Sequence, residues 1–175
     1  LQYTSGSTSD PKGVTLTQSN IATNSATAAK CSGYRPDDRL AAFLPLFHVY
    51  GQNYIMNAAV LAGATLALFR RFVPDQVLEA IGRERITMFF GVPTIFIGLL
   101  SMDLSKYDLS SIRYEMSAAA TMPEEISRRW TERFGRRVYE GYGLTECSPF
   151  ACYNDLVEHR FGSVGRAVEG FELAI

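Results

Sequence analysis

Cysteine and histidine are scarce in this chain of 175 residues, which contains three cysteines and two histidines. Cys31, Cys147 and Cys152 cannot all pair, and they lack the Cys-x-x-Cys spacing, so the sequence indicates neither a disulfide framework nor a zinc site. Unpaired cysteines favour a reducing compartment, and we predict a cytoplasmic protein. Cys147 is better explained as a packed residue than as a thiol nucleophile, because nothing in the sequence places either histidine beside it.

Excess charge of one sign and long apolar runs are also missing. The net charge is −1 with 20% charged residues, which gives no reason to expect nucleic acid or an anionic membrane as a partner. Arginines between Arg128 and Arg137 form the densest basic group, and a solvated helix face explains them better than a binding patch. The longest apolar run, Ile86 to Leu100, is shorter than the ~20 residues that span a bilayer.

What the sequence does contain is an alternation of apolar strand patterns with helix patterns. This alternation predicts an α/β layered domain with a mainly parallel sheet flanked by helices, and ligands at strand ends. We expect strands at Leu1–Tyr3, Leu40–Leu46, Thr65–Phe69, Ile86–Val92, Ile112–Ser117, Val138–Tyr142 and Phe171–Ile175. The first expected helix is capped by Thr17 and runs through Ile21–Ala29, and the second covers Gln52–Ala62 and is closed by Gly63. Two more helices are expected from Pro74 to Arg85 and over Pro93–Ser101. The last is expected to follow a capping box at Thr121–Glu124 and to end at Gly135.

The stretch Tyr3-Thr-Ser-Gly-Ser-Thr-Ser-Asp-Pro-Lys-Gly-Val14 is typical of a phosphate-binding loop. Its hydroxyls flank a glycine whose backbone N–H groups can face an anion, and Lys12 adds a positive charge. The spacing does not fit the Walker A loop, because five residues separate Gly6 from Lys12 and a proline precedes the lysine. A mobile Ser/Thr/Gly linker is the alternative, although a linker has no need for the Pro-Lys-Gly end.

This stretch resembles the phosphate-binding signature of the acyl-adenylate-forming superfamily, which includes acyl-CoA synthetases. Three later motifs follow in the order of that superfamily: Leu44-Pro-Leu-Phe-His-Val-Tyr-Gly51, Gly141-Tyr-Gly-Leu-Thr-Glu146, and Gly162-Ser-Val-Gly165 with Gly170. The resemblance implies that residues 1–175 are part of an AMP-binding domain, truncated at both ends and without the C-terminal lid domain. The absence of an initiator methionine agrees with an excerpt from a longer enzyme.

The resemblance also implies roles for individual residues. Tyr142 would stack on adenine, Thr145 would bond the α-phosphate, Glu146 would bind Mg²⁺, and His48 would lie near the carboxylate. The implied nucleotide-binding positions are Thr4, Ser5, Gly6, Ser7, Thr8, Ser9, Lys12, Ala118, Ala119, Ala120, Gly141, Tyr142 and Gly143. From the residues alone, Tyr142 is equally well explained as a core aromatic, and His48 is better explained as a core histidine.

The implied activity is ATP-dependent conversion of a carboxylic acid to an acyl-adenylate and then to a CoA thioester, with ATP, Mg²⁺ and CoA as cofactors. His48 and Leu144 stand where amino-acid adenylation domains usually have aspartate and proline, so the acid is expected to lack an α-amine and to be fatty or aromatic. Tyr50, Tyr54, Ile55 and the Phe89–Ile97 region are candidate walls for its tail, or simply core. Two alternatives stay open: a ligase that loads a carrier protein, and a non-catalytic fragment or degenerate homologue.

Two departures from the superfamily pattern favour the alternative of a non-catalytic fragment or degenerate homologue. Ser9 replaces the second glycine of the phosphate loop, where a left-handed backbone would be strained by about 1 kcal/mol or more. Ser117-Ala118-Ala119-Ala120 replaces the usual Ser-Gly-Gly-Ala, so added methyl groups are expected to narrow the pocket. Because the superfamily's ribose-binding aspartate and catalytic lysine do not lie within these residues, the chain alone is expected to be inactive.

Overall fold

A computed structural model describes residues 1–4, 10–154 and 157–174. Its strands are β1 (Gln2–Thr4), β2 (Lys12–Val14), β3 (Arg39–Ala42), β4 (Thr65–Leu68), β5 (Met88–Gly91), β6 (Tyr114–Ser117), β7 (Val138–Gly143), β8 (Phe150–Tyr153) and β9 (Arg166–Ala167). Its helices are α1 (Gln18–Cys31), the π-helix η1 (Tyr50–Asn57), α2 (Ala58–Ala62), α3 (Pro74–Glu84), α4 (Pro93–Leu100), α5 (Glu124–Phe134) and the 3₁₀ helix η2 (Thr145–Cys147).

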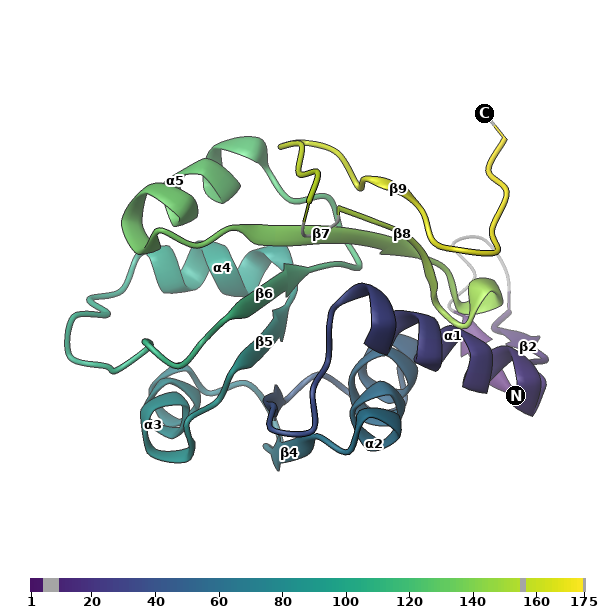
Figure 1. The fold of residues 1–175 in the computed structure, drawn as a ribbon, viewed down its shortest axis with the longest axis horizontal. Helices are drawn as coiled ribbons and strands as arrows, with labels where there is room; N and C mark the ends of the chain where they lie inside the picture. Colours follow the sequence, from purple (N-terminus) through teal and green to yellow (C-terminus); the bar gives the residue numbers. More distant parts are fainter. Residues whose placement is uncertain (5–9, 155–156, 175) are drawn as a thin grey trace.

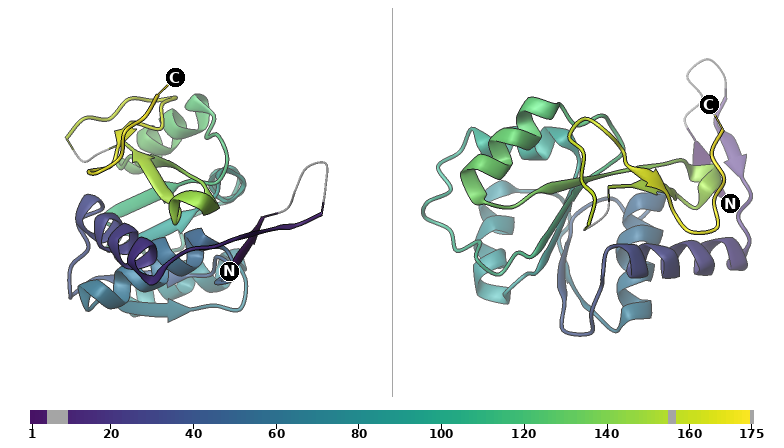
Figure 2. Two further views of the ribbon diagram at one scale, coloured as in Figure 1. Left: turned by 90° about the vertical axis from the view of Figure 1, so that its right-hand side faces the viewer. Right: turned by 45° about the horizontal axis from the view of Figure 1, so that its top comes forward.

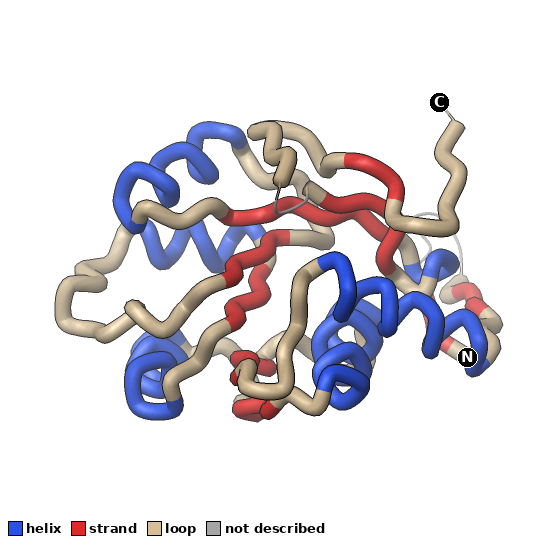
Figure 3. Tube along the Cα trace, in the orientation of Figure 1, coloured by secondary structure: helices blue, strands red, loops and turns tan. Residues whose placement is uncertain are grey.

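The fold is a mixed α/β arrangement with a mostly parallel central sheet, as expected (Figures 1 and 3). Within the described residues the strand order is β4-β3-β5-β6-β7-β8-β9; β4 to β7 pair in parallel, and β8 and β9 add antiparallel pairs at the β7 edge. The parallel strands are short, and the central ones are buried on both faces. In β5 and β6 every residue is buried.

Two apolar clusters lie on opposite faces of the sheet and give the molecule three layers. One cluster packs α3, α4 and α5 against the sheet, with Phe96 and Trp130 at its centre. The other packs α1, η1 and α2 against the opposite face, with Tyr54 at 1% exposure. The views in Figure 2 show the helices on either side of the strands.

A separate antiparallel hairpin, β1–β2, projects from the layered body (Figure 2). Its register places Thr4 opposite Lys12. The side chain of Gln2 donates a hydrogen bond to the carbonyl of Phe47, which attaches the hairpin to the segment that contains His48. Residues 5–9, which join the two strands, lie outside the described residues.

Several boundaries differ from the sequence expectations. The helix expected over Gln52–Ala62 begins earlier, as the π-helix η1 followed by α2, although Gly63 ends it in the left-handed conformation as expected. The capping box at Thr121 is wrong: α5 begins at Glu124 with Pro123 as its N-cap, and the Glu124 carboxylate accepts hydrogen bonds from Arg128 instead. No strand forms over 171–174, and the antiparallel β8 and β9 were missed, because runs of four and two residues give no alternation to detect.

At the amino ends of the parallel strands, a buried ion pair joins the segments that precede three of these strands. Asp38, 2% exposed, accepts hydrogen bonds from the Arg113 guanidinium and, at 2.7 Å, from the Thr87 hydroxyl. These residues directly precede β3, β5 and β6. The opposite, carboxyl ends of the strands are therefore left to the loops that contain the sequence motifs.

Candidate functional site

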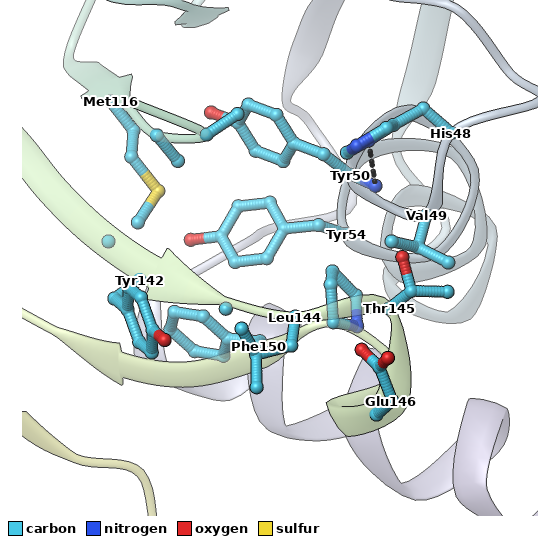
Figure 4. Close-up of a pocket in the computed structure, with 15 residues that line it drawn as sticks. His48, Val49, Tyr50, Tyr54, Met116, Tyr142, Leu144, Thr145, Glu146 and Phe150 are labelled. Carbon is cyan, nitrogen blue, oxygen red and sulfur yellow. Dashed lines mark hydrogen bonds between the residues drawn. The ribbon is translucent and has the colours of Figure 1, made fainter. Parts of the chain in front are cut away.

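The loops after the parallel strands surround a cavity of about 240 Å³ at the carboxyl end of the sheet. It is lined by His48, Val49, Tyr50, Tyr54, Met116, Ala118, Ala119, Gly141, Tyr142, Gly143, Leu144, Thr145, Glu146, Pro149 and Phe150. Figure 4 shows Tyr50 and Tyr54 extending from η1 toward Met116 of β6, with Tyr142 and Thr145 on the β7 side. Three segments far apart in the sequence thus meet where the α/β topology places ligands.

The motif Gly141–Glu146 forms the end of β7 and the short helix η2. Tyr142 is 46% exposed, so it is not the core aromatic of the alternative interpretation. Gly143 is required by a close backbone contact, because a side chain there would overlap the Pro149 carbonyl. A side chain at Gly141 would displace only the terminal methyl group of Met116. Tyr142 is consequently held at the cavity by a strand end that Gly143 lets pass close to Pro149.

Thr145 and Glu146 lie at the start of η2, beside the cavity. Thr145 is half-buried and Glu146 is exposed. Across the described ranges, no salt bridge reaches the Glu146 carboxylate, and no group of three or more histidine, cysteine or acidic side chains forms a metal site. A single free carboxylate fits Mg²⁺, which proteins usually hold through one or two carboxylates together with substrate phosphates.

His48 lies at the opposite side of the cavity, in the segment between β3 and η1. It is exposed, and its Nδ1 accepts a hydrogen bond of 3.1 Å from the backbone N–H of Tyr50. That bond leaves Nε2 as the atom available to a ligand, with a proton to donate in the neutral ring. The core-histidine interpretation is therefore wrong.

Ala118 and Ala119 line the cavity after β6, whereas Ala120 does not. Ala119 adopts the left-handed conformation with φ of 70°, which glycine adopts without strain. Both alanines therefore lie at the cavity, and the narrowing expected from their methyl groups stays a prediction. The strain at Ala119 could not be located from the sequence, because the three alanines are equivalent there.

The remaining expected binding residues are on or beyond the hairpin. Thr4 and Lys12 face each other across β1–β2, but neither lines the cavity. Ser5, Gly6, Ser7, Thr8 and Ser9 lie outside the described residues. Of the candidate walls for an acyl tail, Tyr50 and Tyr54 line the cavity, while Phe89 and Phe96 belong to the core on the other face of the sheet.

Glu140 was missed in the sequence, although an acid inside an apolar strand signals it. It is 4% exposed, and burial raises the pKa of its carboxyl to about 7. Hydrogen bonds from the backbones of Met122 and Gly162 lower the pKa, but by less than burial raises it. Its Oε1 has no hydrogen-bond partner among the described residues. Glu140 therefore connects β7 to the loop after Ala120 and to the Gly162–Gly165 motif.

Comparison with known proteins agrees with this geometry. The model of the family described as "AMP-binding enzyme" matches residues 1–175. The chain is 38% identical to the long-chain-fatty-acid–CoA ligase of Bacillus subtilis over 172 residues, 94% of this chain and 30% of that protein. It is similar to ATP-bound MatB from Rhodopseudomonas palustris (TM-score 0.90, 32% identity, 97% of this chain and 33% of that one).

It is also similar to the anthranilate CoA ligase AuaEII in complex with anthranoyl-AMP (TM-score 0.91, 31% identity, 98% of this chain and 34% of that one). The chain thus spans about a third of the length of these relatives. Along the part of the chain that the structure describes, no helix is both long and apolar enough to cross a membrane. Because the family model matches every residue of the sequence, the chain belongs to the AMP-binding enzyme family.

Proposed function

We propose that this chain forms the nucleotide- and acid-binding part of an acid–thiol ligase, which activates a carboxylic acid with ATP and transfers the acyl group to CoA. The supporting observation is the convergence of His48, Tyr142, Thr145 and Glu146 on one cavity at the carboxyl end of the sheet. Two similar proteins bear the names of CoA ligases, one for long-chain fatty acids and one for anthranilate. The proposed compartment is the cytoplasm, where the free cysteines would stay reduced.

In the first step the carboxylate oxygen attacks the α-phosphorus of ATP, and pyrophosphate leaves. Both reactants are anions, so positioning and neutralisation of charge dominate the catalysis. The Thr145 hydroxyl would donate to the α-phosphate, Tyr142 would stack on the adenine, and His48 Nε2 would orient the carboxylate. Thr4, the residues 5–9 and Lys12 would bind the β- and γ-phosphates.

Glu146 would hold Mg²⁺, which neutralises the phosphate oxygens when bound. In the second step the CoA thiol attacks the acyl carbonyl and AMP leaves. We propose a fatty or aromatic acid without an α-amine, because His48 lies at the cavity in the position where an amino-acid adenylation domain would carry the aspartate that pairs with the α-ammonium group. Leu144, which replaces the proline usual in those domains, lies at the same cavity. Tyr50 and Tyr54, whose ring centres are 5.5 Å apart, would contact the tail.

Calorimetric titration of the chain with MgATP tests the nucleotide site. Saturable binding is expected, weakened in Lys12→Ala and Glu146→Gln. Lys106→Ala and Glu125→Gln are matched controls, because these exposed residues lie outside the cavity and should leave the affinity unchanged. A folded chain that binds no MgATP would favour the non-catalytic alternative, and acceptor assays with CoA against a carrier protein in the complete ligase would separate the two enzymatic alternatives.

A further inference from the structure

Two buried asparagine side chains, on two different helices, hold the loop that contains Thr145 and Glu146. Asn24 of α1 is 4% exposed, and its Nδ2 donates to the carbonyls of Cys147 at 3.0 Å and Phe150 at 2.8 Å. Its Oδ1 accepts from the backbone N–H of Phe150 at 3.0 Å. The carboxamide thus pairs with both backbone groups of Phe150, as a neighbouring strand would.

Asn53 of η1 makes the second contact. It is 1% exposed, and its Nδ2 donates to the carbonyl of Ser148 at 3.2 Å, while its Oδ1 accepts from Asn57 at 3.0 Å. Together the two asparagines bind the carbonyls of Cys147, Ser148 and Phe150. All three carbonyls lie within five residues of Thr145, on the return from η2 to β8.

This arrangement adds to the few backbone contacts that the loop makes itself: the Leu144 N–H donates to the Pro149 carbonyl at 3.0 Å, and the β7–β8 pairing ends at Gly143 and Phe150. The helix η2 has three residues, and its local backbone bonds run from Cys147 N to Leu144 O at 3.0 Å and from Ser148 N to Thr145 O at 3.1 Å. Neither the Thr145 hydroxyl nor the Glu146 carboxylate is hydrogen-bonded to a described residue. The placement of both side chains therefore follows from the loop backbone, and Asn24 and Asn53 supply the side-chain hydrogen bonds to it.

We propose that Asn24 and Asn53 are positioning residues, which couple the helices α1 and η1 to the Thr145–Glu146 loop and set its geometry for nucleotide and Mg²⁺. This inference rests on the function proposed above for that loop. A purely structural role would affect folding alone. A positioning role would also change how strongly Mg²⁺ strengthens the binding of ATP, because Glu146 is the residue proposed to hold the metal.

The test compares Asn24→Ser and Asn53→Ser with the unchanged chain, titrated with ATP in the presence and absence of Mg²⁺. Affinity for MgATP should fall by about tenfold or more, since loss of the groups that orient a metal ligand typically costs about 10–100-fold in metal affinity. Affinity for ATP without Mg²⁺ should change much less. Ser111→Ala is the matched control, because its hydroxyl bonds the Ile86 carbonyl at 2.7 Å near the opposite end of the sheet, and it should alter urea stability without altering the effect of Mg²⁺.

A double-variant cycle with Glu146→Gln shows whether the amides act through Glu146. Asn24→Ser added to Glu146→Gln should cause no further loss of the Mg²⁺ effect. Additive losses, or a folded Asn24→Ser chain that binds MgATP like the unchanged chain, would overturn the proposal. Amide hydrogen exchange gives a readout without ligand: exchange at Cys147, Ser148 and Phe150 should accelerate in Asn24→Ser and not in Ser111→Ala, and unchanged exchange would equally refute the inference.

The two failures are distinguishable. If the unchanged chain binds no MgATP, the proposed function fails in this chain, while hydrogen exchange still decides whether the two amides hold the loop. If the chain binds MgATP and Asn24→Ser does too, only the positioning role fails.

Discussion

Ala119 is the residue where the pocket and backbone strain coincide. Its φ of 70° costs an L-residue about 1–2 kcal/mol relative to glycine, whereas glycine loses about 0.4–1 kcal/mol through the entropy of the unfolded chain. We therefore expect Ala119→Gly to be neutral or to raise the free energy of unfolding by up to about 1.5 kcal/mol, measured by urea denaturation.

Ala118→Gly provides the matched control. Ala118 also lines the cavity and is not among the residues with positive φ, so the same deletion of a methyl group should lower the free energy of unfolding by about 0.5–1 kcal/mol. Equal effects of the two substitutions would mean that the strain at Ala119 does not limit stability. The paired variants separate the strain at Ala119 from the general effect of replacing alanine by glycine.

Glu140 should make folding stability depend on pH. Its pKa is about 7 in the fold against an ordinary value of 4.5, so between these values the folded chain binds more protons than the unfolded chain. The stability that protonated Glu140 contributes is complete below pH 4.5 and is lost as the pH rises through about 7. Glu140→Gln, which stays neutral, should therefore become progressively more stable relative to the unchanged chain over this range.

Urea denaturation at a series of pH values measures this difference. Glu79→Gln on the exposed face of α3 is the control for the substitution itself, and its curve should run parallel to that of the unchanged chain. If the Glu140→Gln curve also runs parallel, Glu140 does not titrate in this window, and its carboxyl must be better solvated than its burial indicates.

At the scale of elements, the start of α1 and the start of α5 provide a direct comparison of capping. Thr17 caps α1 through its hydroxyl, which accepts from the Asn20 N–H at 3.0 Å, while Asn20 accepts from the Thr17 N–H at 3.0 Å. Thr17→Ala should lower the free energy of unfolding by about 1 kcal/mol. Thr121→Ala, two residues before the N-cap of α5, should change it by less than about 0.5 kcal/mol. A loss at Thr121 as large as at Thr17 would contradict this assignment of the helix start.

The boundaries of the helices show what could be predicted from the sequence. Helix ends set by Pro74, Gly63 and Gly135 were predicted correctly, because these residues act through their own backbone. The capping box predicted for the start of α5 was wrong, because the Glu124 carboxylate has a competing partner, Arg128, four residues away on the same helix. The π-helix could not be predicted, because Gly51 packs against the Pro45 carbonyl, a contact that only the folded chain contains.

In the candidate site, too, features that depend on neighbouring residues could be predicted, and features that depend on distant contacts could not. Residues within the motifs, such as Thr145 and Glu146, could be singled out because their chemistry is local to a few positions. Asn24 could not, because its partners at Cys147 and Phe150 are more than 120 residues away in the chain, and nothing about an asparagine within a helix indicates a distant backbone. Glu140 lies between these cases, since its charge is visible in the sequence and its partners are not.

At the scale of the whole molecule, the cavity exists only where segments from residue 48 to residue 150 meet, so MgATP should bind the folded chain and not the unfolded one. At a concentration 100 times its Kd, such a ligand stabilises the fold by ~2.7 kcal/mol. For a domain of this size the Tm should rise by about 5–10 °C. Chelation of Mg²⁺ with EDTA should remove most of this shift, and Glu146→Gln should reduce it.

Differential scanning calorimetry at increasing MgATP concentrations measures the shift, and EDTA without nucleotide is the control, which should leave the Tm unchanged because the proposed metal site depends on the phosphates. A Tm that rises equally with ATP in EDTA would show that the nucleotide binds without the metal, and Glu146 would lose its proposed role. The apolar cluster under α3, α4 and α5 and the Asp38–Arg113 pair lie outside the lining of the cavity and stabilise the fold without it. The cavity can therefore hold a strained Ala119 in its lining, where binding of a nucleotide would supply the remaining contacts.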